Sequence, residues 1–209
     1  MKIIDASVEL VQDLNPAEIM KQIERVGRVC YKSESKISDT SAEKFITNII
    51  KSGHESVIEH VSITFKIICD RGISHEIVRH RLASYSQESS RYCDYSNNKF
   101  GGELTFIKPC FWNETDENYL MWRQAMALLE HLYLSMREKG ARPEQARSLL
   151  PNSLKTEIFM TANLREWRHF LKLRTSKRAH PQMREIALKI YKILNEKLPI
   201  LFSDINPEI

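Results

Sequence analysis

The stretch from Val61 to Ile67, Val-Ser-Ile-Thr-Phe-Lys-Ile, alternates apolar and polar residues at every step. Because successive side chains of a strand point to opposite faces, this alternation predicts a β-strand with one buried face. A similar alternation from Ile4 to Leu10 predicts another half-buried strand. Two short stretches, at 104–107 and 156–162, also suit strands.

Helices are predicted between these strands. Asn15 and Pro16 provide an N-cap and a first-turn proline for a helix that reaches Val29. Thr40 and Glu43 have the spacing of a capping box, so a second helix is predicted to run from there to a stop at Gly53. Further helices are predicted at 74–81, 116–139, 142–149, 165–173 and 182–197.

Strands and helices are mixed along the chain without strict alternation, which favours an α+β fold. The chain has 209 residues, and neither a linker nor a repeat nor a change in composition divides it. We therefore predict a single domain over residues 1–209.

The net charge of +4 is unevenly distributed. The segment from Arg165 to Arg184 holds seven of the 31 basic residues and one of the 27 acidic residues, Glu166, which leaves 24 bases and 26 acids elsewhere. A positive charge that is focused in one segment predicts an anionic partner.

Several classes of protein are disfavoured. No apolar stretch approaches the roughly 18 residues of a membrane span, and the start of the chain does not resemble a secretory signal, so a cytoplasmic protein without membrane contact is expected. The four cysteines have neither zinc-site nor disulfide spacing. His75 and His80 are one residue too far apart for the zinc-protease pattern, so no metal site is expected. The six glycines form no phosphate-binding loop, and phosphate would therefore be held by side chains or helix ends.

The segment from Arg79 to Tyr92 combines three arginines, a histidine and several hydroxyl groups. Such a segment is commonly a solvated polar loop. The alternative is a phosphate site, because guanidinium groups match phosphate oxygens in pairs and hydroxyl groups complete the hydrogen bonding. A predicted helix that leads into the segment would give Arg79 a rigid support.

The sequence of this segment resembles the defining motif of the flavin-dependent thymidylate synthases: Arg-His-Arg at 79–81, seven further residues, and Ser89. Three other segments resemble elements of the same family in the same order. They are the His-Glu-Ser segment within 53–60, the Arg-x-x-Leu-Pro element at 147–151, and the ligand-binding helix at 163–174.

This resemblance implies the fold of that family, with a mainly antiparallel sheet flanked by helices. It implies the methylation of dUMP to dTMP, with 5,10-methylenetetrahydrofolate as carbon donor and NADPH as reductant through FAD. It also implies a homotetramer.

The resemblance assigns ligands residue by residue. For dUMP it implies contacts from Glu76, Arg79, Gln87, Glu88, Ser89, Ser90, Arg91, Arg147 and Arg174. For the flavin it implies Ser56, Arg79, His80, Arg81, Gln87, Asn163, Arg165 and His169. His54 and Tyr92 are expected to stack near the flavin or folate, or to be structural. Gln87 stands where many members have glutamate, and His169 stands where others have an amide.

Two residues are expected to be catalytic. Arg174 would stabilise the negative charge that grows on the uracil ring when C5 acts as a nucleophile. Ser89 has no evident base except His80, nine residues away in sequence, and serine is a poor nucleophile without one. We therefore expect Ser89 to act as a hydrogen-bonding ligand of the nucleotide more than as a covalent nucleophile.

The sequence leaves two other functional hypotheses open. An RNA- or nucleotide-binding module would use the basic segment at 165–184, but only Trp167 and Phe170 supply the aromatic residues that such modules interleave with their bases. A non-catalytic family member is the second, and the retained Arg174 and Arg-His-Arg motif argue against it. Our prediction is the enzyme, with small-molecule ligands and no nucleic acid partner.

Overall fold

The computed structural model describes residues 1–208 and contains two compact units. The first unit comprises Met1–Ser7, Ile67–Arg79 and Ser86–Ile158. The second unit comprises Val8–Lys66, His80–Tyr85 and the described residues from Phe159 onward. Because the chain passes between the units several times, no single linker in the sequence separates them.

Four strands form one antiparallel sheet in the order β2-β3-β6-β4. They are β2 (Ser7–Leu10), β3 (Ser62–Asp70), β4 (Ala83–Gln87) and β6 (Lys155–Asn163). β3 and β6 each begin in one unit and end in the other. Ile63, Phe65 and Ile67 of β3 are fully buried while the residues between them are not, so the predicted alternation is confirmed.

The predicted strand from Ile4 to Leu10 is wrong as a single element. The structure has two strands there, β1 (Lys2–Ile4) and β2, and they belong to different sheets. β1 pairs in parallel with β5 (Thr105–Ile107), and the carbonyl of Ile4 accepts a hydrogen bond from Lys108 N at 2.8 Å. The alternation is continuous in the sequence, but the chain passes from one sheet to the other near Asp5. The hydrophobic periodicity does not predict this break.

Helix α1 (Pro16–Val29) is confirmed, and the Asn15 side chain caps it by accepting from Glu18 N. Helix α2 (Ser41–Lys51) is also present, but the predicted capping box is wrong because Thr40 makes no side-chain cap bond. Instead, Ser41 Oγ accepts from Ser38 N at 2.8 Å and donates to Glu24 Oε2 at 2.8 Å. The Ser41 hydroxyl thus links the start of α2 to a carboxylate of α1.

Helix α3 spans Arg71–Ile77, earlier than the predicted 74–81. Its start is fixed by the Asp70 side chain, which accepts from Ile73 N at 2.7 Å. Arg79 therefore lies beyond the helix instead of on it. The polar segment that follows contains strand β4, which the sequence analysis did not predict.

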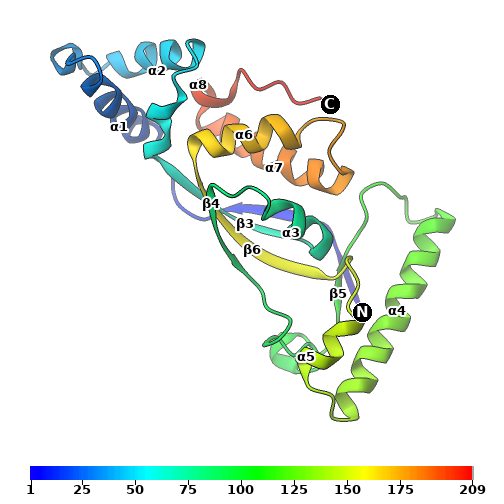
Figure 1. Ribbon diagram of the computed structural model, residues 1–209. Coiled ribbons are helices and arrows are strands. Elements are labelled where there is room, and N and C mark those ends of the chain that lie inside the picture. The colour runs from blue at the N-terminus through cyan, green and yellow to red at the C-terminus, as the bar shows by residue number, and fades with distance from the viewer. Residues whose placement is uncertain (209) are drawn as a thin grey trace. The chain divides into compact units, whose positions relative to one another are not determined.

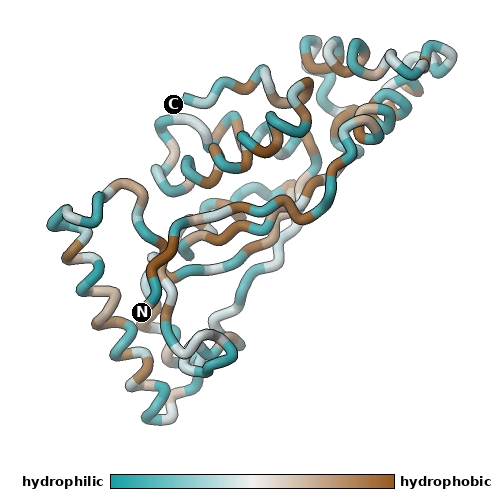
Figure 2. Tube along the Cα trace, turned by 180° about the vertical axis from the view of Figure 1, so that it is seen from behind, coloured by the Kyte–Doolittle hydropathy of each residue, from teal (hydrophilic) through white to brown (hydrophobic). Residues whose placement is uncertain are grey.

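The core of the first unit lies between the β1-β5 pair and helix α4 (Glu117–Glu138) (Figure 1). Helix α5 (Pro143–Ala146) follows α4 in the chain. The buried residues of this core are Tyr95, Leu104, Phe106, Met126, Tyr133, Ala146 and Leu154. Hydrophobic and hydrophilic residues are mixed along α4 (Figure 2), and the predicted helix at 116–139 is confirmed. Gly140 ends the helix region with φ +86°, a conformation that glycine adopts without strain.

In the second unit, α6 (Leu164–Arg174) and α7 (Pro181–Lys197) lie side by side (Figure 1), and α8 (Pro199–Phe202) follows them. Both longer helices were predicted, and α8 was not. The Trp167 indole is fully buried, donates from Nε1 to Ile63 O at 3.0 Å and meets the Phe65 ring at 5.1 Å. The buried Arg168 guanidinium binds Glu55 and Asp204 and so joins α6 to the C-terminal residues.

The described residues also contain short 3-10 helices: η1 (Glu34–Lys36), η2 (Glu55–His60), η3 (Asn98–Phe100) and η4 (Arg147–Leu149). The four cysteines are free thiols, as predicted. None of the described helices is long and apolar enough to cross a membrane. The mixture of elements confirms the predicted α+β class with an antiparallel sheet and flanking helices.

The ion pair between Asp94 and Arg137 predicts a pH-dependent stability. Arg137 donates to both carboxylate oxygens, at 2.9 and 2.6 Å, and this lowers the pKa of Asp94 to about 2. A depressed carboxyl pKa stabilises the fold above the ordinary pKa of aspartate, and this contribution disappears as the pH falls toward 2. We expect Asp94→Asn to lower the free energy of unfolding by about 1 kcal/mol at neutral pH and by almost nothing near pH 2.

Urea unfolding at several pH values measures this difference. Asp39→Asn, a change at an exposed aspartate, is the matched control and should leave the pH dependence unchanged. A constant difference between Asp94→Asn and the wild type from neutral to acid pH would contradict the prediction.

Candidate active site

The predicted ligand residues fall into two groups, one in each unit. The first unit holds most of the residues expected to contact dUMP: Glu76, Arg79, Gln87, Glu88, Ser89, Ser90, Arg91 and Arg147, together with Tyr92. The second unit holds most of those expected to contact the flavin: Ser56, His80, Arg81, Asn163, Arg165 and His169, together with His54 and Arg174.

In the first unit, a turn follows β4 and carries the serine of the motif. The Ser89 carbonyl accepts from Tyr92 N at 3.1 Å and from Cys93 N at 2.9 Å, which closes the turn. The hydroxyl of Ser89 accepts from Arg91 N at 3.3 Å. The side chains of Arg79, Arg91 and Arg147 are exposed, so three guanidinium groups of this unit are open to an anionic ligand.

The side chains of Gln87 and Glu88 hold this turn in place. Gln87 Nε2 donates to Ser74 Oγ at 2.9 Å and to Thr156 Oγ1 at 3.1 Å. Glu88 accepts from the Tyr95 hydroxyl at 2.8 Å and forms an ion pair with Lys155 at 2.9 Å. Burial raises the pKa of the Tyr95 hydroxyl, and the Glu88 carboxylate raises it further. Both carboxylate oxygens of Glu88 are thus engaged inside the protein.

In the second unit, a cavity of about 580 Å³ contains three of the residues expected to bind the flavin. It is lined by Glu55, Glu59, Leu82, Asn163, Arg165, Glu166, His169 and Lys172. A second cavity of about 330 Å³ contains His54 and Ser56, and it shares Glu55 and Arg165 with the first. The predicted flavin residues of η2 and α6 are therefore brought together by the fold of this unit.

The cations of these cavities are held by exposed ion pairs. Arg165 Nη1 lies 2.5 Å from Glu59 Oε1, and Lys172 Nζ lies 3.4 Å from Glu55 Oε1. Exposed ion pairs contribute about 0 to 1 kcal/mol, so both cations can change partner at little cost. Of the seven basic residues in the segment at 165–184, Arg168 is fully buried and binds Asp204, whereas Arg165, Lys172, Lys177 and Arg178 are exposed.

His80 is the buried member of the Arg-His-Arg motif, 5% exposed, whereas Arg79 and Arg81 are exposed. Its Nδ1 lies 2.9 Å from Glu166 Oε1, and its Nε2 accepts from Arg174 Nε at 3.1 Å. Burial lowers the pKa of the imidazole, Arg174 and His169 lower it further, and Glu166 raises it. A neutral histidine therefore connects a buried carboxylate to the arginine that was predicted to be catalytic.

His80, Glu166 and His169 place one potential ligand atom each within 4.8 Å of one another, a spacing that a metal ion could use. Both ring nitrogens of His80 are already hydrogen-bonded, and one of their partners is the Arg174 guanidinium. A cation at this position would be repelled by that arginine, so the cluster is better explained by its hydrogen bonds.

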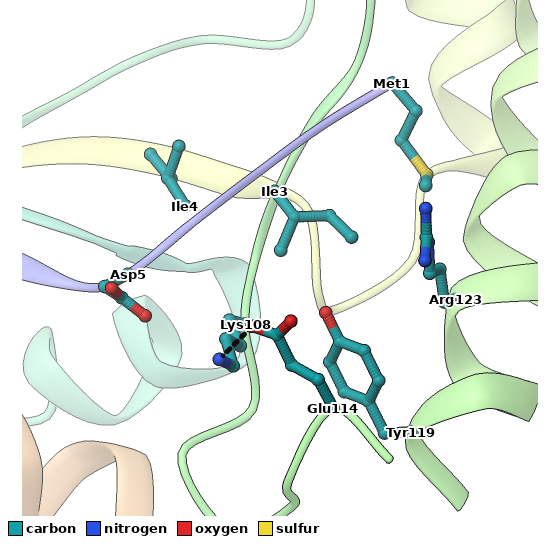
Figure 3. A pocket seen from close by; sticks show the side chains of 8 residues that line it. All are labelled: Met1, Ile3, Ile4, Asp5, Lys108, Glu114, Tyr119 and Arg123. Atoms are coloured by element: carbon teal, nitrogen blue, oxygen red, sulfur yellow. Dashed lines mark hydrogen bonds and ion pairs between the residues drawn. The ribbon is translucent and has the colours of Figure 1, made fainter. Parts of the chain in front are cut away.

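A further pocket, of about 400 Å³, lies in the first unit between β1 and the start of α4 (Figure 3). Lys108 and Glu114 form an ion pair in it at 2.5 Å, and Asp5, Tyr119 and Arg123 also line it. None of the predicted ligand residues lies in this pocket.

Glu166 is the residue that the sequence analysis missed. It is the only acidic residue between Arg165 and Arg184, and this lone acid in a basic segment could have marked it as a candidate site residue. Lys155 and Tyr95, which hold Glu88, were missed as well, and nothing in their local sequence marks them.

Comparison with known proteins identifies the family of this chain. A protein-family model described as "Thymidylate synthase complementing protein" matches residues 9–200. The chain is 38% identical to the flavin-dependent thymidylate synthase of Pyrococcus furiosus over 184 residues, which are 88% of this chain and 72% of that protein. It is 39% identical to the enzyme of the same name from Pyrococcus abyssi, over 76% of this chain and 64% of that protein.

Among solved structures, the crystal structure of a UMP/dUMP methylase, PolB from Streptomyces cacaoi, bound with 5-Br dUMP, has a TM-score of 0.79. The alignment covers 97% of this chain and 96% of that one at 23% identity, so it supports the fold. The chain belongs to the flavin-dependent thymidylate synthase family, as its Arg-His-Arg motif predicted.

The exposed position of Arg165 at both cavities predicts its contribution to flavin binding. A diphosphate would replace Glu59 as its partner, and loss of this charged hydrogen bond costs about 1.5 to 3 kcal/mol. We expect Arg165→Ala to raise the dissociation constant for FAD about tenfold or more. Fluorescence titration of the protein with FAD measures this change.

Arg25→Ala, which removes an exposed arginine of α1 in the same unit, is the control and should bind FAD like the wild type. Equal affinities of Arg165→Ala and Arg25→Ala would show that Arg165 has no part in binding the flavin.

Proposed function

We propose that this chain catalyses the reductive methylation of dUMP to dTMP, with 5,10-methylenetetrahydrofolate as carbon donor and NADPH as reductant, giving tetrahydrofolate and NADP⁺. The observation that carries the proposal is the match of the thymidylate synthase family over residues 9–200, a span that includes every residue of the predicted site. The chain is thus an enzyme, a methyltransferase of dTMP biosynthesis.

The donor set of the second unit fits FAD. Ser56, Asn163 and His169 offer hydrogen-bonding groups at the two cavities, and Arg165 offers a cation that can leave Glu59 for a diphosphate. No glycine-rich loop is needed when side-chain cations take this part. When bound there, FAD would supply the hydride-transfer chemistry that reduction of the transferred carbon by NADPH requires.

The first unit supplies the groups for the nucleotide phosphate. The exposed guanidinium groups of Arg79, Arg91 and Arg147 suit a dianion, because each offers a planar pair of donors. The hydroxyls of Ser89 and Ser90 add neutral hydrogen bonds. We assign Ser89 the role of a ligand because serine is a poor nucleophile without an adjacent base.

Arg174 carries the chemical step in this proposal. C5 of uracil is a weak nucleophile, and it becomes reactive toward the carbon donor when the ring takes on negative charge that is delocalised over N3, O4 and C5. A guanidinium near these atoms stabilises the negative charge as it develops. Arg174 suits this role because the hydrogen bond between its Nε and His80 holds the plane of the guanidinium in one orientation.

The proposal includes the assembly and the location of the enzyme. We propose that residues 1–209 act as one catalytic domain, that four copies form a homotetramer, and that the enzyme works in the cytoplasm with small-molecule ligands only. The family to which the chain belongs supports these points.

The function itself is tested with purified protein. We expect a yellow protein with stoichiometric flavin that NADPH bleaches, and release of tritium from C5 of labelled dUMP only when methylenetetrahydrofolate is present. A colourless protein that ignores added FAD, or a protein that releases no tritium, would contradict the proposal.

Two substitutions separate the roles of the proposed catalytic residues. Arg174→Ala is expected to lose nearly all turnover, because the charge on the ring is no longer stabilised. A single electrostatic donor of this kind is worth about 10²- to 10³-fold in kcat. Ser89→Ala is expected to retain measurable turnover, because a neutral hydrogen bond to the nucleotide is lost and the chemistry is not. Tritium release under saturating dUMP measures both.

The opposite result has a distinct signature. Complete loss of turnover in Ser89→Ala with dUMP binding preserved, together with a trapped serine adduct in the wild type, would make Ser89 a nucleophile.

A further inference from the structure

Glu166, His80 and Arg174 form a hydrogen-bonded chain inside the second unit. Glu166 and Arg174 lie at the two ends of one face of α6, with Phe170 between them, because residues four apart share a helix face. His80 packs on this face with its ring 4.8 Å from Phe170. Glu166 and His80 are each 5% exposed, so the chain is shielded from water for most of its length.

The partners of His80 determine where its proton lies. A guanidinium only donates hydrogen bonds, so Nε2, which faces Arg174 Nε, must be the unprotonated acceptor. In the neutral ring the proton is then on Nδ1, and it is donated to the Glu166 carboxylate at 2.9 Å. The opposite tautomer would place two donors against each other at Nε2 and leave the buried carboxylate without this donor.

The neighbouring groups favour the neutral ring. Burial, Arg174 and His169 lower the pKa of His80, while Glu166 raises it. Phe170 contributes an apolar face, and the Tyr85 hydroxyl donates to the His80 carbonyl at 2.6 Å. Protonation of the ring would turn Nε2 into a donor and break the bond with Arg174.

The start of α6 is itself fixed. The Asn163 side chain accepts from Glu166 N at 2.9 Å, so the residue that carries the carboxylate is held by the helix cap. A buried carboxylate beside a neutral histidine is a costly arrangement for a protein interior. The Glu166–His80 pair is therefore expected to add little to the stability of the fold, and its main effect is to select the tautomer of His80.

We propose that Glu166 is a positioning residue: it holds His80 as the Nδ1-protonated tautomer, and His80 in turn orients the Arg174 guanidinium toward the pyrimidine ring. This inference rests on the proposed function, which gives Arg174 its role. It assigns to Glu166 an effect on the chemical step without contact with a ligand.

The first experiment needs no ligand. In protein that contains isotope-labelled histidine, heteronuclear NMR reports which ring nitrogen of His80 carries the proton, and His80→Gln identifies the signal. We expect a neutral, Nδ1-protonated ring at neutral pH. A ring protonated on Nε2, or a charged ring, would overturn the proposal even if the enzyme is active.

The second experiment uses Glu166→Gln. An amide offers a donor as well as an acceptor, so it no longer enforces one tautomer. We expect kcat for dUMP-dependent tritium release to fall about tenfold or more, because small errors of orientation are costly in catalysis. KM for dUMP should change less than about threefold, because the proposed phosphate ligands lie in the first unit.

The pH profile separates positioning from a structural role. Because the Glu166 carboxylate raises the pKa of His80, its loss should lower that pKa and move the acid limb of kcat to lower pH. Glu166→Asp keeps the charge on a shorter side chain and should recover part of kcat. Glu185→Gln, the same change in a part-buried ion pair of α7, should match the wild type.

The outcomes are distinguishable. Wild-type kcat and pH profile in Glu166→Gln would overturn the inference. A wild type that releases no tritium would contradict the proposed function, while the NMR experiment would still decide the tautomer. If Glu166→Gln does not fold, Glu166→Asp and the tautomer of the wild type give the answer.

Discussion

The packing of Trp167 against β3 is the interaction on which the second unit depends. The indole is fully buried, its Nε1 donates to the carbonyl of Ile63, and its ring meets Phe65 edge to face at 5.1 Å. A buried tryptophan with a satisfied N–H combines a large apolar area with one directional bond. It therefore fixes the rotation of α6 about its own axis. Since Glu166 and Arg174 lie at fixed angles to Trp167 on that helix, the packing decides that both face His80.

Local patterns were sufficient to predict most elements of the fold. β3, α1 and α6 follow from a period of two residues, a capping asparagine and a helical period, all of which are encoded within a few residues. The errors arose where a distant residue takes over a local role. At the start of α2, Ser41 binds the distant Glu24 while Thr40 makes no cap bond, and β1 pairs with the distant β5 while β2 joins the other sheet.

The sequence was sufficient to predict which residues belong to the candidate site, but not which of them form hydrogen bonds with one another. The resemblance to the family gave His80 and Arg174 because both belong to sequence motifs. The hydrogen bond that joins them connects residues 94 positions apart, and Glu166 reaches His80 across 86 positions. The same holds for Lys155, which binds Glu88 across 67 positions. Such pairs are products of the tertiary fold, and no periodicity or spacing in the sequence records them.

Two arginines on α6, to which we assign different roles in the proposed function, lie in different environments. Arg165 is exposed, and its partner Glu59 is exposed as well, so the pair is weak and the guanidinium can move to an incoming anion. Arg174 is held through its Nε by a buried imidazole, which is held in turn by a buried carboxylate. Binding a flexible diphosphate requires a cation that can adapt, whereas stabilising a charge that exists only during the reaction requires a cation that is already in place. The difference in burial between Glu59 and Glu166 therefore separates an adaptable arginine from a fixed one, nine residues apart on the same helix.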